Sequence, residues 1–203
     1  MKTVAAFDFD KTISTRDNVV PFLIAVAGRG AFLAALTTAT PDLVRRRRNA
    51  VKAHLVRRLL TGRSSADVQQ VADAFAADVI ARHLRDDVLA RAEWHRGEGH
   101  ARAFVSASFV PYVQPVADHL GFDATLATDF AVGADGLLTG ELSGPNVRGP
   151  EKVRRLDAWL AGEPGIVWAY GDSSGDRELL ARADHAVRVG RQPLTPAPTR
   201  DGT

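Results

Sequence analysis

The sequence predicts an α/β protein, a doubly wound parallel sheet with an all-helical cap inserted after the first strand. Three observations support this prediction. A short apolar run at residues 4–7 ends at two carboxylates, residues 16–98 keep a helical spacing without any strand pattern, and strands alternate with helices from residue 101 onward. Such alternation is typical of parallel sheets covered by helices on both faces. The first strand therefore belongs with the later ones.

Length and composition fit one domain with an insertion. The 203 residues are 45% hydrophobic and 25% charged, which is ordinary for a soluble globular protein. There is no cysteine, which excludes disulfides and thiolate metal sites, and a cytoplasmic location is expected. The formal net charge of +2 is too small to indicate nucleic acid as a partner. The sequence carries no signal of oligomeric state.

The first predicted strand, Val4 to Phe7, places Asp8 and Asp10 at its carboxyl end. The period of two directs both side chains the same way. Two carboxylates in this position repel each other unless a cation lies between them. A hard divalent metal such as Mg²⁺ suits oxygen ligands at phosphate sites. On its own such a pair is also common in solvated turns. The rest of the chain is therefore needed to distinguish a metal site from a solvated turn.

The inserted segment begins with two apolar helices joined by a Gly28-Arg29-Gly30 turn. Residues 19–39 form the most membrane-like stretch, but Pro21 and this turn break it into pieces too short to span a bilayer. No stable membrane insertion is therefore expected, while contact with a membrane surface stays open. The chain starts with the predicted strand instead of the basic and apolar segments of a secretory signal.

Three further helices are expected to complete the insertion. One opens at Pro41-Asp42 and ends near residue 61. The next is capped by Ser64 or Ser65 and carries an apolar stripe at steps of three and four residues. The third covers residues 86–95.

The second half predicts an alternating series of strands and helices. Strands are expected at residues 101–106, 123–128, 165–170 and 185–189, helices at 111–120, 150–160 and 177–182, and a hairpin at 130–142. Beyond residue 190, prolines in a polar context predict a disordered tail. The expected organisation is a core of residues 1–15 and 99–190, a cap of residues 16–98 and a tail of residues 191–203.

Polar side chains from distant parts of the chain are expected to meet at one edge of the sheet. Ligands of doubly wound sheets bind beyond the carboxyl ends of the strands, and Asp8, Ser106 and Asp172 each fall at such an end. Lys152 and Asp176 lie close to the starts of the predicted helices at residues 150–160 and 177–182. Phosphoryl transfer needs these kinds of group, namely a carboxylate nucleophile, a second acid, a cation and hydroxyl donors.

Four motifs in order along the chain resemble the haloacid dehalogenase-like hydrolases, in their phosphoserine phosphatase-like branch. The matching segments are Asp8-Phe9-Asp10-Lys11-Thr12, Val105-Ser106-Ala107-Ser108, Lys152 and Gly171-Asp172-Ser173-Ser174-Gly175-Asp176. One motif alone is a weak signal, whereas the ordered set is specific and spans nearly the whole chain. The resemblance also implies that the helical insertion is the cap of this branch.

The resemblance implies a role for each matching residue. Asp8 is the expected nucleophile and Asp10 the general acid and base. Mg²⁺ is expected on the Asp8 carboxylate, the Asp10 backbone carbonyl and Asp172, with Asp176 in support, although Asp176 also stands where it could cap a helix. The phosphoryl oxygens are expected to contact Thr12, Ser106, Ala107 and Lys152.

The chain also departs from phosphoserine phosphatases. Ala107-Ser108 replace the usual Gly-Gly, Gly175 replaces an Asn, and the shorter Asp17 stands for the cap Glu that meets the substrate amine. Ser108 is open between a helix cap and a substrate contact. Arg45 and Arg48 are candidate contacts for an anionic group of the substrate, the alternative being a solvated basic face.

We therefore expect a Mg²⁺-dependent phosphatase that hydrolyses a small-molecule phosphomonoester through an aspartyl-phosphate intermediate. Phosphoserine, histidinol phosphate or a similar metabolite would suit this chemistry. Two alternatives stay open. One is a phospho-accepting signalling domain of the receiver type, although such domains are usually shorter and lack a helical insertion. The other is a phosphotransferase whose acceptor is not water.

Overall fold

A five-stranded parallel sheet forms the centre of the protein. The computed structural model describes residues 2–39, 48–162 and 165–197. The strand order is β3-β2-β1-β6-β7, and all neighbouring pairs are parallel. The strands are β1 (Lys2–Phe7), β2 (Ala101–Phe109), β3 (Ala124–Thr128), β6 (Gly165–Gly171) and β7 (His185–Arg188). The predicted doubly wound α/β fold is confirmed.

The first strand of the chain lies in the middle of the sheet because it is apolar on both faces. Val4 pairs with Ala101 on one side and with Val167 on the other. Val4 and Ala6 pack into the hydrophobic cluster on one face of the sheet. Ala5 and Phe7 pack into the cluster on the other face. A strand buried on both faces reads as a continuous apolar run, as this one does.

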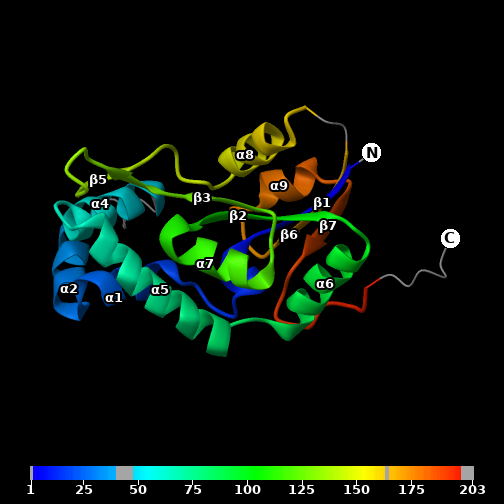
Figure 1. The fold of residues 1–203 in the computed structure, drawn as a ribbon, viewed down its shortest axis with the longest axis horizontal. Coiled ribbons are helices and arrows are strands. Elements are labelled where there is room, and N and C mark those ends of the chain that lie inside the picture. The colour runs from blue at the N-terminus through cyan, green and yellow to red at the C-terminus, as the bar shows by residue number, and fades with distance from the viewer. Residues whose placement is uncertain (1, 40–47, 163–164, 198–203) are drawn as a thin grey trace.

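Helices cover both faces of the sheet (Figure 1). On one face lie α8 (Pro150–Leu160) and α9 (Arg177–Arg182), whose leucines pack against the inward side chains of β1, β2 and β6. On the other face lie α6 (Asp86–Gly97) and α7 (Val110–Leu120). Three of these helices agree with the predicted ranges within a residue or two, and α6 extends two residues beyond its predicted end.

Four helices gather at the end of the molecule toward which β1 and β2 run (Figure 1): α1 (Val19–Ala27), α2 (Arg29–Thr38), α4 (Arg48–Leu60) and α5 (Ser65–Arg82). Gly28, with a φ of 84°, separates α1 from α2, and the two helix axes are bent by 117°. In the described ranges no single helix is long and apolar enough to cross a membrane, whereas the bent α1–α2 pair together has the necessary length and composition.

Two details of the cap sharpen the predictions. Ser64, and not Ser65, caps α5, because its Oγ accepts a hydrogen bond from the Asp67 backbone N–H at 3.3 Å. The predicted helix start at Pro41-Asp42 and the candidate Arg45 lie outside the described residues. The predicted hairpin forms as β4 (Phe130–Val132) and β5 (Leu138–Leu142) and packs against α4, separate from the main sheet.

The last helix of the insertion packs on the core. Val88, Ala92 and His95 of α6 are buried, and His95 Nε2 lies 2.8 Å from the Tyr170 hydroxyl of β6. These contacts attach α6 to the sheet. The predicted cap boundary at residue 98 stays a prediction. Residues 191–197 of the predicted tail lie against α6. The Leu194 N–H donates to Asp87 at 2.8 Å, and the Thr195 carbonyl accepts from Arg91 Nη2 at 2.8 Å. These two hydrogen bonds give the segment partners that its composition does not indicate.

Candidate active site

A cavity of about 670 Å³ opens at the carboxyl ends of β1, β2 and β6, beneath the cap helices α1 and α4. It brings together residues that lie far apart in the sequence. The predicted site residues that line it are Asp8, Asp10, Asp17, Arg48, Ser106, Ala107, Lys152, Asp172 and Asp176. Thr12 is fully buried behind Asp8, and its Oγ1 donates to Asp8 Oδ2 at 3.5 Å.

Asp8 sits at the floor of this cavity with three donors around its carboxylate. Lys152 Nζ donates to Oδ1 at 2.5 Å, Ser106 Oγ donates to the same oxygen at 3.1 Å, and Thr12 reaches the other oxygen. The Asp8 backbone N–H donates to the Tyr170 carbonyl at 2.9 Å, which continues the ladder between β1 and β6. The sheet itself therefore fixes the position of this carboxylate.

Lys152 connects two carboxylates. Its Nζ lies 2.5 Å from Asp8 Oδ1 and 2.6 Å from Asp176 Oδ1, and the side chain is almost completely buried. Burial alone lowers the pKa of Lys152, but the charges of Asp8 and Asp176 outweigh it and raise the pKa above its ordinary value. The residue therefore presents a permanent positive charge beside Asp8. Burial raises the pKa of Asp8 to about 6, against the opposing charge of Lys152.

The loop after β6 supplies two more carboxylates. One oxygen each from Asp8, Asp172 and Asp176 lies within 4.8 Å of the others. Asp176 accepts from the Ser173 backbone N–H and hydroxyl at 2.9 Å each, so its side chain orders this loop and makes no capping bond to α9. Three clustered carboxylate oxygens match the hard oxygen ligands that Mg²⁺ takes. The residues present therefore fit a divalent cation.

Gly171 makes the close packing of this loop possible. A Cβ at this position would lie 2.5 Å from the Cβ of Asp176 and 2.7 Å from its Cγ. Any side chain there would push Asp176 away from Lys152. The glycine at the start of the fourth motif is thus required by close approach.

The side chain of Asp10 points to different partners from those of Asp8. Asn18 donates to Asp10 Oδ1 from its backbone N–H at 3.1 Å and from Nδ2 at 2.8 Å, and Ser108 Oγ donates to Oδ2 at 2.8 Å. Burial, followed by the charges of Asp17 and Asp8, raises the pKa of Asp10 to about 7, although the two hydrogen-bond donors oppose the shift. A carboxyl group with such a pKa can both give and take a proton near neutral pH.

Sequence reasoning missed two residues that shape the site. Asn18 is buried and holds Asp10, but nothing in the sequence marked it. Lys52 is also buried, and its Nζ donates to the Ala107 carbonyl and to Asn146 Oδ1, the latter at 2.7 Å. Lys52 shares its spacing with the buried Leu55 and Leu59, so a lysine on an apolar stripe was an available signal.

The cap forms the wall of the cavity opposite the carboxylates. Asp17 and Arg48 line it with exposed side chains, and Asp17 Oδ1 accepts from the Val19 backbone N–H at 3.1 Å. Ser108 Oγ donates to Asp10 and does not cap α7, and Ser108 is not among the residues that line the cavity. The rest of the cap lining is two polar residues of α4, Asn49 and Lys52, and five aliphatic ones, Val19, Val20, Leu23, Val51 and Leu55.

The fold and this site define a phosphatase-like hydrolase, an enzyme whose carboxylates stand at the end of a parallel sheet below a helical cap. The chain belongs to the haloacid dehalogenase-like hydrolase family, whose model matches residues 5–181.

Among similar proteins, Protein CicA of Caulobacter vibrioides is 37% identical over 186 residues, which cover 89% of this chain and 83% of that protein. A phosphoserine phosphatase of Halobacterium salinarum is 31% identical over 204 residues, covering 94% and 87%. A solved structure of a Bordetella pertussis protein of unknown function has a TM-score of 0.74 at 26% identity, covering 89% of this chain and 86% of that chain.

Proposed function

We propose that the chain is a Mg²⁺-dependent cytoplasmic phosphatase that hydrolyses a small-molecule phosphomonoester through a phosphorylated Asp8. The observation that carries this proposal is the position of Lys152 Nζ, which lies within hydrogen-bonding distance of both Asp8 and Asp176 at the base of the cavity. A cation and two hydroxyl donors around one carboxylate form a place for a phosphoryl group to be attacked and held.

In the first step, a carboxylate oxygen of Asp8 attacks phosphorus, and the bond from phosphorus to the substrate's ester oxygen breaks. Asp10 donates its proton to the leaving alkoxide. Its pKa of about 7 leaves a large protonated fraction at neutral pH. Lys152 and Ser106, which contact Asp8, are placed to offset charge on the phosphoryl oxygens.

In the second step, water attacks the aspartyl phosphate. Asp10, now a carboxylate, takes a proton from this water, the bond between phosphorus and the Asp8 oxygen breaks, and inorganic phosphate leaves. Asn18 and Ser108 keep the Asp10 carboxyl group in one orientation for both steps. Uncatalysed phosphomonoester hydrolysis is so slow that such enzymes lower the barrier by roughly 20 kcal/mol or more.

Mg²⁺ would be held by the carboxylates of Asp8, Asp172 and Asp176, with the Asp10 backbone carbonyl as the further ligand that the family resemblance implies. When bound, it would neutralise phosphoryl charge and help align the phosphoryl group for in-line attack.

The substrate is proposed to be a small metabolite such as phosphoserine, histidinol phosphate or a related compound. The Halobacterium relative named a phosphoserine phosphatase supports this class. Asp17 is the proposed contact for a substrate amine, since its exposed carboxylate lines the cavity. Arg48, at the start of α4, is proposed to face the same space.

Release of phosphate from p-nitrophenyl phosphate in the presence of Mg²⁺ tests the proposal, followed by a screen of phosphorylated metabolites. Asp8→Asn should lower the rate by about 10³-fold or more while circular dichroism shows an intact fold. Turnover near the parent rate in Asp8→Asn would refute the assignment of the nucleophile. A stable phosphoprotein without turnover would favour a receiver-type domain, and phosphate transfer to added alcohols in place of water would indicate a phosphotransferase.

A further inference from the structure

Arg148 is a half-buried arginine at the cavity that the proposed mechanism does not use. It lies in the loop before α8, four residues ahead of Lys152, and lines the same cavity as Asp8. Its Nη2 donates to Ser174 Oγ at 3.1 Å. No described carboxylate lies within 4 Å of its guanidinium, so its charge is not neutralised by an ion pair with those residues.

Gly175 provides the space that this guanidinium occupies. A Cβ at position 175 would overlap Arg148 Nη1 and would lie 2.8 Å from its Cζ. Phosphoserine phosphatases usually carry an Asn at this position, and such a side chain would displace the arginine. The observed position of the Arg148 guanidinium therefore depends on the glycine at position 175.

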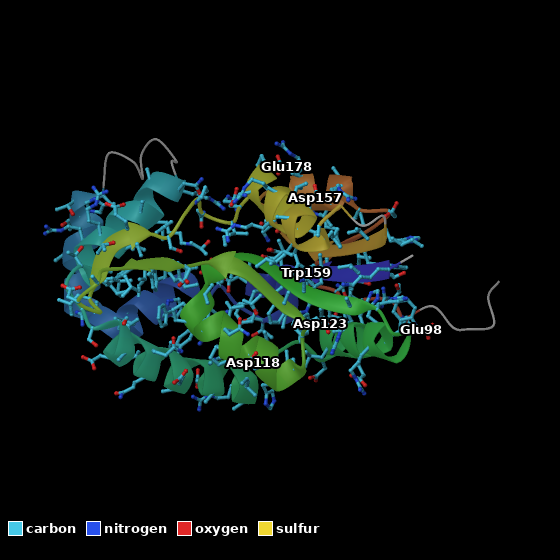
Figure 2. All side chains as sticks on the ribbon, turned by 45° about the horizontal axis from the view of Figure 1, so that its top comes forward. Glu98, Asp118, Asp123, Asp157, Trp159 and Glu178 are labelled. Atoms are coloured by element: carbon cyan, nitrogen blue, oxygen red, sulfur yellow. The ribbon has the colours of Figure 1, made fainter. Side chains whose placement is uncertain are left out.

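Besides its hydrogen bond to Ser174, Arg148 could have a structural role through Glu178. The hydrogen bond from Arg177 is the main reason that the pKa of Glu178 is lowered, and the charge of Arg148 contributes only a smaller part. Glu178 Oε1 accepts from Arg177 at 2.8 Å, and Glu178 lies on α9, at the top of the view in Figure 2. Arg148 is thus near Glu178 but does not contact it.

We propose that Arg148 is a specificity residue that binds a second anionic group, a carboxylate or a further phosphate, on the leaving group of the substrate. This inference rests on the proposed phosphatase function. A guanidinium presents a planar fork of donors that matches such anions in a bidentate manner. The one side-chain hydrogen bond of Arg148 to a described residue is to Ser174, and Arg148 and Asp8 line the same cavity of about 670 Å³, which can hold a small leaving group.

The test compares 3-phosphoglycerate with glycerol 3-phosphate, which differ by a carboxylate in place of a hydroxymethyl group. We expect the unaltered chain to show a higher kcat/KM for 3-phosphoglycerate, and Arg148→Ala to lower the ratio of the two values by about tenfold or more. Gly175→Asn should lower it likewise, and Arg148→Lys should keep part of it. The bisphosphate 1,3-propanediol diphosphate, assayed alongside, shows whether the second anion is a carboxylate or a phosphate.

The matched control is Arg177→Ala, an exposed arginine one residue past Asp176 that does not line the cavity. It should leave the ratio unchanged, as should Glu178→Gln if Arg148 does not act through Glu178. The inference would be overturned if, in the unaltered chain, kcat/KM for 3-phosphoglycerate and for the bisphosphate were no higher than for glycerol 3-phosphate. An equal loss of kcat/KM for all three substrates in Arg148→Ala would overturn it as well. The latter result would mean that Arg148 serves the phosphoryl group that is transferred.

A binding measurement separates this inference from the proposed function. Calorimetric titration of 3-phosphoglycerate, the bisphosphate and glycerol 3-phosphate into Asp8→Asn, and into Asp8→Asn with Arg148→Ala, requires no turnover. A larger loss of affinity for 3-phosphoglycerate or the bisphosphate than for glycerol 3-phosphate when Arg148 is removed would support the second anion site even if the chain hydrolyses no phosphomonoester. An equal change for all three ligands, or no change, would overturn it.

Discussion

Ser108 Oγ donates a 2.8 Å hydrogen bond to Oδ2 of Asp10, and this bond joins the end of β2 to the turn after β1. Both side chains come from motifs that lie nearly a hundred residues apart. Ser108 occupies a position where phosphoserine phosphatases usually have glycine, so this chain adds a hydroxyl that restricts the orientation of the proposed acid.

Asp10→Asn should reduce turnover by about 10²- to 10⁴-fold because the side chain can no longer transfer a proton. Ser108→Ala should cost roughly tenfold, because Asp10 loses one of its orienting donors. Steady-state rates with p-nitrophenyl phosphate measure both, and Ser143→Ala at an exposed site is the control. If Ser108 acts through Asp10, Ser108→Ala should lower the rate little further in the Asp10→Asn background. A further loss of about tenfold in rate in that background would contradict this role.

Gly171→Ala should destabilise the protein by about 1–3 kcal/mol, because the new Cβ would overlap Asp176. Activity should fall as well, since Asp176 would move away from Lys152. Urea denaturation gives the free energy of unfolding. Gly97→Ala is the matched control, because nothing lies within 4 Å of its added Cβ and its φ is not positive; as a helical position of α6 it should gain up to about 1 kcal/mol. An equal change in the free energy of unfolding in Gly171→Ala and Gly97→Ala would contradict the close approach of Gly171 to Asp176.

Lys52 should make stability depend on pH. Burial lowers its pKa from 10.5 to about 7, although the charges of Asp10 and Asp17 oppose the shift. Between these two values the unfolded chain keeps the proton and the folded chain releases it. The contribution of Lys52 to the free energy of unfolding therefore rises with pH across this window, by up to about 1.4 kcal/mol per unit.

Lys52→Met removes this titration. The stability of the unaltered chain minus that of Lys52→Met should increase from pH 7 toward pH 10, as measured by urea denaturation at a series of pH values. Arg58→Met on the exposed side of the same helix is the control. A difference that stays constant with pH would show that Lys52 keeps its proton in the folded state.

Removal of Mg²⁺ with a chelator should abolish turnover, and added Mg²⁺ should restore it. Asp172→Asn should raise the Mg²⁺ concentration needed for half-maximal activity by about tenfold or more, because one charged ligand is lost. Asp157→Asn, on the outer side of α8 (Figure 2), should change nothing, since Asp157 is a half-exposed partner of Arg182. Full activity in the presence of excess chelator would refute metal dependence.

The sequence was sufficient for the architecture because its signals are local. An apolar run that ends in Asp8, alternation from residue 101 onward and a glycine-led motif at Gly171 each mark an element without reference to the others. The structure confirms the sheet and brings the predicted carboxylates, Ser106 and Lys152 to one cavity.

The partners of these groups could not be predicted, because contacts between distant segments determine them. Asn18 and Ser108 select the orientation of Asp10 only once the cap entry and β2 are packed together. The packing of Arg148 against Gly175 likewise appears only in three dimensions. The sequence shows that the usual Asn is absent, but not that the Arg148 side chain occupies the space next to Gly175.

The central place of β1 has a consequence for how the chain folds. Val4 pairs with Ala101 on one side and Val167 on the other, so the backbone pairing of β1 is complete only when segments about 100 and 160 residues further along the chain are in place. Contacts of such long sequence separation slow folding, because loop closure must precede them. Until β6 is in place, the apolar strand β1 lacks a neighbour on one edge, and an unpaired apolar edge of this kind favours aggregation of the partly folded chain.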